Sequence, residues 1–341
     1  MTRLFRSCLS FAMMLWLICL SSQNKILAQS QGEIAALFAQ SASLNDTQKI
    51  VSIFHISDSL QTVNPILGLA LLEALQKKDF YKKAKYHPEM IFLHRGILHK
   101  NNGNYAAAIQ DLEAFYTISK EKNIFQDMAA AKYKLADIYI EEKRTELAIE
   151  SNLEAIALYE KIKDDAMIIS SKIQMVAIYK HKERFKESLA ILQEIVQKIP
   201  FESPQRLGVY NQLANVYDQL GELDSAIVYN KMYFETAKKF KDLPGQFIAK
   251  YNEGLNHFNL ERYDLAKNNF LEALTIAEAS NIPLFKPYAM ISLIDANVRL
   301  GKTNEGLSLL QEASGLALNR EQRKMLAEVS YKLHKEQGNY K

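Results

Sequence analysis

The chain has 341 residues and a formal net charge of +3, with 42 basic and 39 acidic side chains. This balance lacks the basic excess that nucleic-acid-binding proteins carry, so we expect no nucleic-acid partner. Only 12 glycines and 7 prolines occur, which favours helices joined by short turns over a sheet-rich fold.

Residues 1–28 have the layout of a secretory signal peptide. Arg3 and Arg6 precede an uncharged apolar run at 8–20, which is shorter than the ~20 residues that span a bilayer. We predict cleavage after Ala28, and therefore an exported, periplasmic protein with no integral membrane segment after cleavage.

Loss of this segment would change the chemistry of the chain. Its two cysteines, Cys8 and Cys19, would leave with it, so no disulfide or thiol chemistry is expected in the exported protein. Ile18 is bulkier than a lipid-attachment motif allows, which argues against a lipid anchor at Cys19. Three basic residues and no acidic residue are lost, which brings the net charge to zero.

Two helices are predicted in the region after the signal peptide. TQKIVSIFHISDSLQ (47–61) forms the first, and NPILGLALLEALQKK (64–78) forms the second. Asn64 is the expected N-cap of the second helix, with Pro65 in its first turn. The residues before this pair are loose or form a short helix. We take 29–88 as a degenerate first repeat that caps the stack of repeats described next.

From residue 89 onward, one position recurs at intervals of 40, 40, 38, 40 and 40 residues. It is occupied by Gly96, Ala136, Val176, Ala214, Gly254 and Ile294. Twelve residues after each stands a small residue: Ala108, Ala148, Ser188, Ala226, Ala266 and Gly306. A constant period with a constant internal offset indicates a structural repeat. Because glycine inside a helix costs about 1 kcal/mol relative to alanine, Gly254 indicates a contact too close for a methyl group.

This pattern resembles the tetratricopeptide repeat (TPR), a helix–turn–helix unit with small residues at its packing positions. The clearest copies are KLADIYIEEKRTELAIESNLEAIALYE (134–160) and NQLANVYDQLGELDSAIVYN (211–230). The resemblance implies an all-α fold, a right-handed α-solenoid of stacked antiparallel helix pairs, with six repeats over 89–319. The early tryptophan of the family is absent, and the period exceeds the usual length of about 34 residues. Such long-period repeats resemble the sensory parts of exported bacterial signalling proteins.

The C-terminal segment, 320–341, is open to two interpretations. RKMLAEVSYKLHKEQGNYK (323–341) is a predicted helix followed by GNY, a tripeptide that also opens the turn at 103–105. The helix is either the solvating cap that solenoids carry or the first helix of a truncated eighth repeat.

No catalytic or metal-binding motif is found in the sequence. There is no HExxH, no glycine-rich phosphate loop and no GxSxG, and His99 and His257 occupy a position of the repeat that other copies fill with Tyr or Asn. The residues at that position in the other copies are Tyr139, Tyr179, Tyr217 and Asn297. We therefore predict packing histidines, no catalytic residue, no metal, no cofactor and no enzyme activity.

The resemblance implies a binding groove on the concave face, lined by the first helix of each repeat. The candidate partner-binding residues carried over in this way are Tyr133, Asp137, Lys180, Asn211, Asn215, Asp218, Tyr251 and Phe258. Asparagine can donate to and accept from a peptide backbone, and the aromatic pair would take apolar side chains. Exposed helix faces are polar even without a ligand. The basic residues of the family's carboxylate clamp are missing, so a preference for C-terminal peptide tails is not expected.

Two functions from different classes follow. The first is a non-enzymatic exported scaffold that binds a protein or peptide partner through its concave groove. The alternative is the periplasmic sensor part of a split or truncated membrane-bound histidine kinase or helix-turn-helix transcriptional regulator, with a membrane-bound signalling partner. A neighbouring gene that encodes a transmembrane span and an output domain would favour the sensor.

Overall fold

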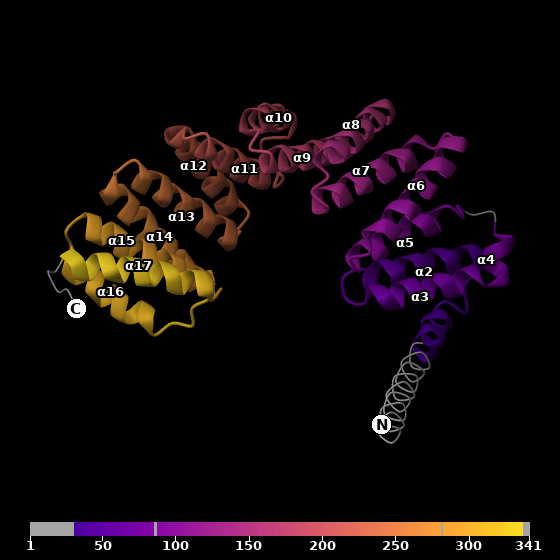
Figure 1. The fold of residues 1–341 in the computed structure, drawn as a ribbon, viewed down its shortest axis with the longest axis horizontal. Coiled ribbons are helices and arrows are strands. Elements are labelled where there is room, and N and C mark those ends of the chain that lie inside the picture. The colour runs from indigo at the N-terminus through magenta and orange to yellow at the C-terminus, as the bar shows by residue number, and fades with distance from the viewer. Residues whose placement is uncertain (1–30, 85–86, 281, 337–341) are drawn as a thin grey trace, which may run out of the picture. The chain divides into compact units, whose positions relative to one another are not determined.

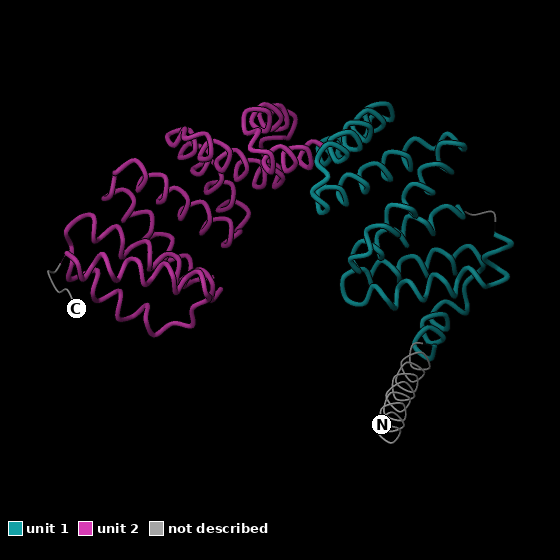
Figure 2. The backbone as a smooth tube through the Cα atoms, viewed as in Figure 1, with its two compact units in different colours: residues 1–171 teal, residues 172–341 magenta. Residues whose placement is uncertain are grey.

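The computed structural model describes residues 31–84, 87–280 and 282–336. Within these ranges the backbone forms helices and turns, without strands (Figure 1), which confirms the predicted all-α class. The chain divides into two compact units, 1–171 and 172–341 (Figure 2). The predicted signal peptide and the final GNY lie outside the described residues.

Among the described residues, the first unit contains a helical stretch at 31–39 and seven further helices. These are α2 (Asp46–Leu60), α3 (Pro65–Gln76), α4 (Asp79–Lys83), α5 (Met90–Asn101), α6 (Tyr105–Glu121), α7 (Phe125–Glu141) and α8 (Thr145–Ile162). The Asn64 side chain accepts a hydrogen bond from the backbone N–H of Leu67, so α3 has the predicted N-cap.

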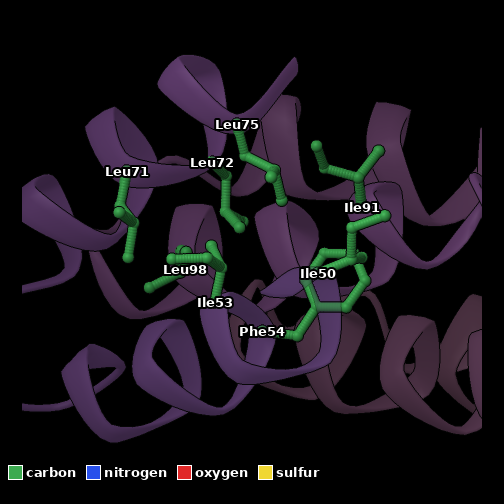
Figure 3. Close-up of a cluster of buried hydrophobic side chains, with 8 residues drawn as sticks. All are labelled: Ile50, Ile53, Phe54, Leu71, Leu72, Leu75, Ile91 and Leu98. Carbon is green, nitrogen blue, oxygen red and sulfur yellow. The ribbon is translucent and has the colours of Figure 1, made fainter. Parts of the chain in front are cut away.

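A cluster of buried aliphatic side chains and one aromatic joins α2, α3 and α5. Its members are Ile50, Ile53, Phe54, Leu71, Leu72, Leu75, Ile91 and Leu98. Figure 3 shows that these side chains point toward one another from their separate helices. A Cβ at Gly68 would lie 2.7 Å from the Leu98 side chain, so this glycine lets α3 and α5 approach closely.

The second unit begins inside α9 (Asp165–His181) and contains the remaining helices. These are α10 (Phe185–Lys198), α11 (Arg206–Gln219), α12 (Leu223–Lys239), α13 (Leu243–Asn259), α14 (Tyr263–Ser280), α15 (Phe285–Arg299), α16 (Thr303–Ser314) and α17 (Arg320–Glu336). The last of them, α17, packs on α15 and α16 and buries Val329 and Leu333. Its other side chains include the exposed Lys324 and Tyr331.

The recurring small residues lie where helices touch, as the period predicts. Ala266 is fully buried, and a Cβ at Gly254 would lie 2.6 Å from the ring of Phe270 on α14. A Cβ at Gly96 would likewise lie 2.9 Å from the Leu112 side chain on α6. The glycines therefore admit large neighbours at close range.

Each predicted repeat turns between its helices in the same left-handed conformation. The residue with positive φ is Gly103, Lys143, Glu183, Gly221, Glu261 or Gly301. The N–H of the next residue reaches back to a helix carbonyl, for example from Arg262 to His257 at 2.9 Å. This is the Schellman motif, in which glycine is favoured because a Cβ is strained at positive φ.

We expect Glu261→Gly to stabilise the protein. Glu261 has a φ of 58°, and the left-handed conformation costs an ordinary residue roughly 1–2 kcal/mol, part of which is offset by the greater freedom of glycine in the unfolded chain. The free energy of unfolding in urea should rise by about 1 kcal/mol. Gly221→Ala, at a φ of 75°, is the matched control and should lower it. Equal midpoints for both variants would contradict this explanation of the turn.

Candidate functional site

The predicted partner-binding residues fall in both units. Tyr133 and Asp137 lie on α7 in the first unit, and the other six lie on α9, α11 and α13 in the second. The contacts of each group are therefore those of its own unit.

In the first unit, Asp137 is part of an ion-pair cluster between α5 and α7. Lys100 Nζ donates to the Asp137 carboxylate and lies 3.0 Å from a carboxylate oxygen of Glu141. Burial alone would lower the pKa of Lys100, but the hydrogen bonds to both carboxylates raise it above its ordinary value. The Tyr105 hydroxyl also donates to Glu141, at 2.8 Å. Asp137 therefore links two repeats in this structure.

The half-buried Tyr133 packs beside the small cluster of α7, α8 and α9 side chains that includes Tyr159. Burial raises the pKa of Tyr133, and a nearby carboxylate, Asp137, adds to the shift. Its phenol therefore stays neutral at ordinary pH.

In the second unit, Asn211 and Asn215 lie one helical turn apart on α11. Both are half-buried, and Asn215 Nδ2 donates to Asn211 Oδ1 at 3.4 Å. Within the described ranges, no further hydrogen bond is found for Asn211 Nδ2 or Asn215 Oδ1. The pair therefore presents one donor and one acceptor, which is the complement of a peptide group.

Asp218, one turn further along α11, is engaged by asparagines that the sequence reading missed. Asn256 Nδ2 on α13 donates to Asp218 Oδ1 at 2.7 Å, and Asn230 Nδ2 on α12 donates to Asn256 Oδ1 at 2.9 Å. Both asparagines are buried. The sequence does mark both asparagines, because each stands at a position where most other repeats have an apolar residue. Asp218 is thus the outer end of a buried polar chain.

Tyr251 and Phe258 are both half-buried, and both pack against the cluster that includes Ala266 and Phe270. The Tyr251 ring stacks on Phe247 at 5.7 Å, and Ser292 Oγ on α15 donates to its hydroxyl at 3.2 Å. Phe258 meets Tyr263 edge-on at 5.2 Å between centroids. Phe258 also lines a pocket.

One pocket that Phe258 lines has a volume of about 140 Å³ and lies between α13, α15 and α17, with Phe270 contributed by α14. Its lining residues are Leu255, Phe258, Phe270, Ile291, Ser292, Asp295, Met325, Glu328, Val329 and Lys332. The Lys332 Nζ donates to both carboxylate oxygens of Asp295, at 2.8 and 3.1 Å. Sequence reasoning placed Phe258 in the groove but missed the contribution of α17.

Lys180 is half-buried near the end of α9, and we find no ion pair for it within the described part of the chain. Its ammonium group is therefore open to a partner carboxylate.

One group of possible metal ligands was not predicted. His87, Glu89 and Asp127 place ligand atoms within 4.8 Å of one another. However, Lys122 Nζ donates to the buried Glu89 carboxylate at 2.5 Å, and His87 Nδ1 lies 3.0 Å from its other oxygen. A cation would have to displace this ammonium group, so the arrangement fits a structural ion pair better than a metal site.

The buried His257 and the half-buried His99 each lie beside a carboxylate. His257 Nε2 lies 3.8 Å from Glu253 on α13, and His99 Nε2 lies 3.7 Å from Asp111 across α5 and α6. Burial lowers the pKa of both histidines and raises the pKa of both carboxyl groups. Each histidine therefore tends to remain neutral in the folded protein.

We expect the protein to lose stability as the pH falls below the unfolded histidine pKa of about 6.5. The unfolded chain then binds a proton that the buried His257 resists, and the loss continues down to the folded pKa. Glu253 acts in the opposite direction, because its raised pKa makes the folded state lose stability as the pH rises.

The measurement is the urea midpoint at pH 7.5 and at pH 5.5, both roughly one unit from that pKa. His257→Tyr, which adopts the residue of three sister repeats, should lose less stability on acidification than the unchanged protein. His334→Tyr at an exposed position is the control and should leave the pH dependence as it was. An identical pH dependence in all three proteins would refute the assignment to His257.

Within the described ranges, none of the helices combines the length and the apolar character needed to cross a membrane.

The stacked helix pairs, three-residue turns and small residues at helix contacts define an α-solenoid. Residues 148–313 match the family described as the SusR N-terminal TPR domain, and residues 129–162 match the family described as the tetratricopeptide repeat. The chain is a tetratricopeptide repeat protein. A search of curated proteins found no match.

Several solved structures share this fold, and two of the three that follow are described as containing TPR repeats. A TPR repeat-containing protein from Cytophaga hutchinsonii is 15% identical, with a TM-score of 0.58 over 80% of this chain and 99% of that one. The apo form of RapI is 14% identical, with a TM-score of 0.54 over 73% and 99%. A signal transduction ATPase with a TPR sensor, from Pyrococcus horikoshii, is 18% identical, with a TM-score of 0.59 over 90% of this chain and 51% of that one. These likenesses establish the fold, which generally serves as a non-enzymatic protein-interaction scaffold.

Proposed function

We propose that the protein is an exported scaffold whose second unit binds an extended segment of a protein partner. The binding face comprises α11, α13, α15 and α17. The observation that carries this proposal is the Asn211–Asn215 pair, with its available donor and acceptor half-buried on α11. The layout of 1–28 supports export, and the TPR fold supports a protein partner over a chemical reaction.

The dimensions of the face suit an extended chain. Helices α11 and α13 are in contact, as are α13 and α15, and packed helix axes lie about 8–10 Å apart. An extended peptide advances roughly 3.3 Å per residue, so about three residues would lead from one helix to the next. A segment held at the asparagine pair would therefore reach the pocket beside Phe258 with a few further residues.

Loss of the asparagine pair should weaken binding without unfolding the protein. The double variant Asn211→Ala and Asn215→Ala removes two hydrogen bonds to the segment, each worth roughly 0.5–1.5 kcal/mol. We expect about tenfold weaker binding of a captured partner by calorimetry or fluorescence anisotropy. Asn268→Ala on α14, at an exposed position, is the matched control. Unchanged affinity in a fully helical double variant would exclude this face.

The export assignment has a separate test. Antibody detection after fractionation of the source cells should find the shortened chain in the periplasm. A chain of full length in the cytoplasm would contradict it.

The sensor function is the second candidate. Two likenesses support it: the matched family is named for the N-terminal TPR domain of SusR, and the Pyrococcus ATPase carries its TPR array as a sensor. In that function, the bound segment would change the contact of this protein with a membrane-bound signalling partner. Site-specific cross-linking in cells, from α17 with and without inducing conditions, distinguishes a signalling contact from a constant one.

A further inference from the structure

The pocket between α13, α15 and α17 combines an apolar floor with a charged rim. The apolar side chains of its lining include Leu255, Phe258, Phe270, Ile291 and Val329. Helices α13 and α17 both contact α15, which places the pocket within the second unit (labelled in Figure 1). The pocket thus lies on the same unit as the Asn211–Asn215 pair, on the side toward the last helices.

The size of the pocket fits a single side chain. Its volume is about 140 Å³. An apolar cavity of about 150 Å³ holds one benzene molecule in other proteins, so a leucine, methionine or phenylalanine side chain is the matching occupant. A tryptophan is larger than this space, and a polar side chain would lose its hydration without gaining partners on the floor.

The rim carries an excess of negative charge. Asp295 is satisfied by Lys332, which contacts both of its carboxylate oxygens. Glu328 is the remaining charged residue of the lining, and its nearest cation is Lys324 at 3.9 Å on the same helix, beyond hydrogen-bond distance. The side chain of Glu328 is 60% exposed and can meet a cation from outside. The rim is therefore complementary to a basic group.

On the basis of the proposed function, we propose that this pocket receives one apolar side chain of the bound segment, next to a lysine or arginine that pairs with Glu328. The apolar side chain supplies affinity, because its transfer from water into the apolar pocket is favourable. The basic neighbour supplies selectivity, because an acidic residue at the same place would face Glu328. The partner is thus a protein segment with an apolar–basic pair, and the asparagine pair holds its backbone a few residues away.

The test is a selection from a random peptide library displayed on phage, with the full chain as the immobilised target. Peptides enriched on the unchanged protein should share a leucine, methionine or phenylalanine adjacent to lysine or arginine. Glu328→Lys should replace the enriched basic residue by an acidic one, while Glu336→Lys, the same reversal at an exposed position of α17, should leave the preference intact. Both positions are at the surface, and helical circular dichroism verifies the fold of each variant.

A synthetic copy of the most enriched peptide then gives affinities. Replacement of its apolar residue by alanine should weaken binding about 10-fold or more, and replacement of its basic residue should weaken it about two- to fivefold. Met325→Trp, which fills the pocket from α17, should weaken binding of the parent peptide and leave binding of the alanine-substituted peptide unchanged.

The outcomes separate the two proposals. Two results would overturn the assignment of the pocket: enriched peptides that lack an apolar–basic pair, or selection of the same apolar–basic pair by the Glu328→Lys variant. Either result would leave peptide binding by the second unit in place. A failure to enrich any peptide on the unchanged protein would overturn both. Peptides whose binding ignores Asn211→Ala and Asn215→Ala but follows Glu328 would support the pocket and reject the asparagine pair.

Discussion

Replacement of Gly254 by alanine should destabilise the protein by about 2 kcal/mol, although alanine is the better helix former. The new Cβ would lie 2.6 Å from the ring of Phe270, which is fully buried and would have to shift. Overpacking of this kind costs roughly 1–3 kcal/mol and outweighs the gain in helix propensity of about 1 kcal/mol. Urea denaturation measures the difference.

Gly208 is the matched control for this experiment. It lies inside α11, it is exposed, and beyond its chain neighbours and the backbone of its own helix no atom lies within 4 Å of the position of its Cβ. Gly208→Ala should therefore stabilise the protein by up to about 1 kcal/mol, the opposite sign from Gly254→Ala. If both variants shift stability in the same direction, close packing is not the reason for Gly254.

A second variant tests the contact itself. Phe270 stands sixteen residues after Gly254 and is the largest residue at its position of the repeat. In another repeat the same two positions are held by Val176 and Leu192, so a larger first residue goes with a smaller second one. Phe270→Leu should therefore recover part of the stability lost in Gly254→Ala. Additive losses in the double variant would show that the two residues do not interact.

Substitutions of the buried Asn230 and Asn256 should change the free energy of unfolding in a strongly non-additive way. Asn230→Leu leaves the Asn256 carbonyl without its donor, and Asn256→Ile leaves the Asn230 amide without its acceptor. Each single change should cost about 1–3 kcal/mol, the usual penalty for a buried polar group without a partner. The double variant should approach the stability of the unchanged protein, because it removes both polar groups together.

The chain itself supplies the precedent for this double variant. The equivalent positions of the first repeats are occupied by Leu112 and Ile138, both buried. Asp218 would lose its hydrogen bond from Asn256, but this carboxylate is only half-buried and can be hydrated. A double-mutant cycle in urea gives the coupling energy, and a double variant weaker than either single one would reject the account.

The sequence was sufficient for the fold because the repeat is set by steric fit. Gly96, Ala136 and Gly254 recur at a fixed period and lie at helix contacts, as expected of small residues where backbones approach. Local signals also sufficed for the start of α3, where Asn64 and Pro65 act within a single turn. Such features depend on neighbours in sequence or on a constant period, and a reader of the sequence has both.

The candidate site was less accessible to sequence reasoning, since it depends on side chains from different repeats. Nothing in the sequence pairs Lys100 with Asp137 or shows that Tyr251 is held by Ser292, because a rotamer and a helix rotation decide each contact. Nor did the sequence show that side chains of α17 line the pocket, because the candidate residues were taken only from the first helices of the six predicted repeats. The division into domains and the ligand-binding roles of the residues stay predictions.

The short sequence separation of the contacts between repeats affects the rate of folding. The hydrogen bonds of Lys100 with Asp137, of Asn256 with Asp218 and of Ser292 with Tyr251 join residues 37, 38 and 41 positions apart. Contacts of such short sequence separation require little loop closure, so we expect fast folding that can nucleate at several helix pairs. A chain emerging from the ribosome would then acquire structure progressively, before its C-terminal repeats have been synthesised.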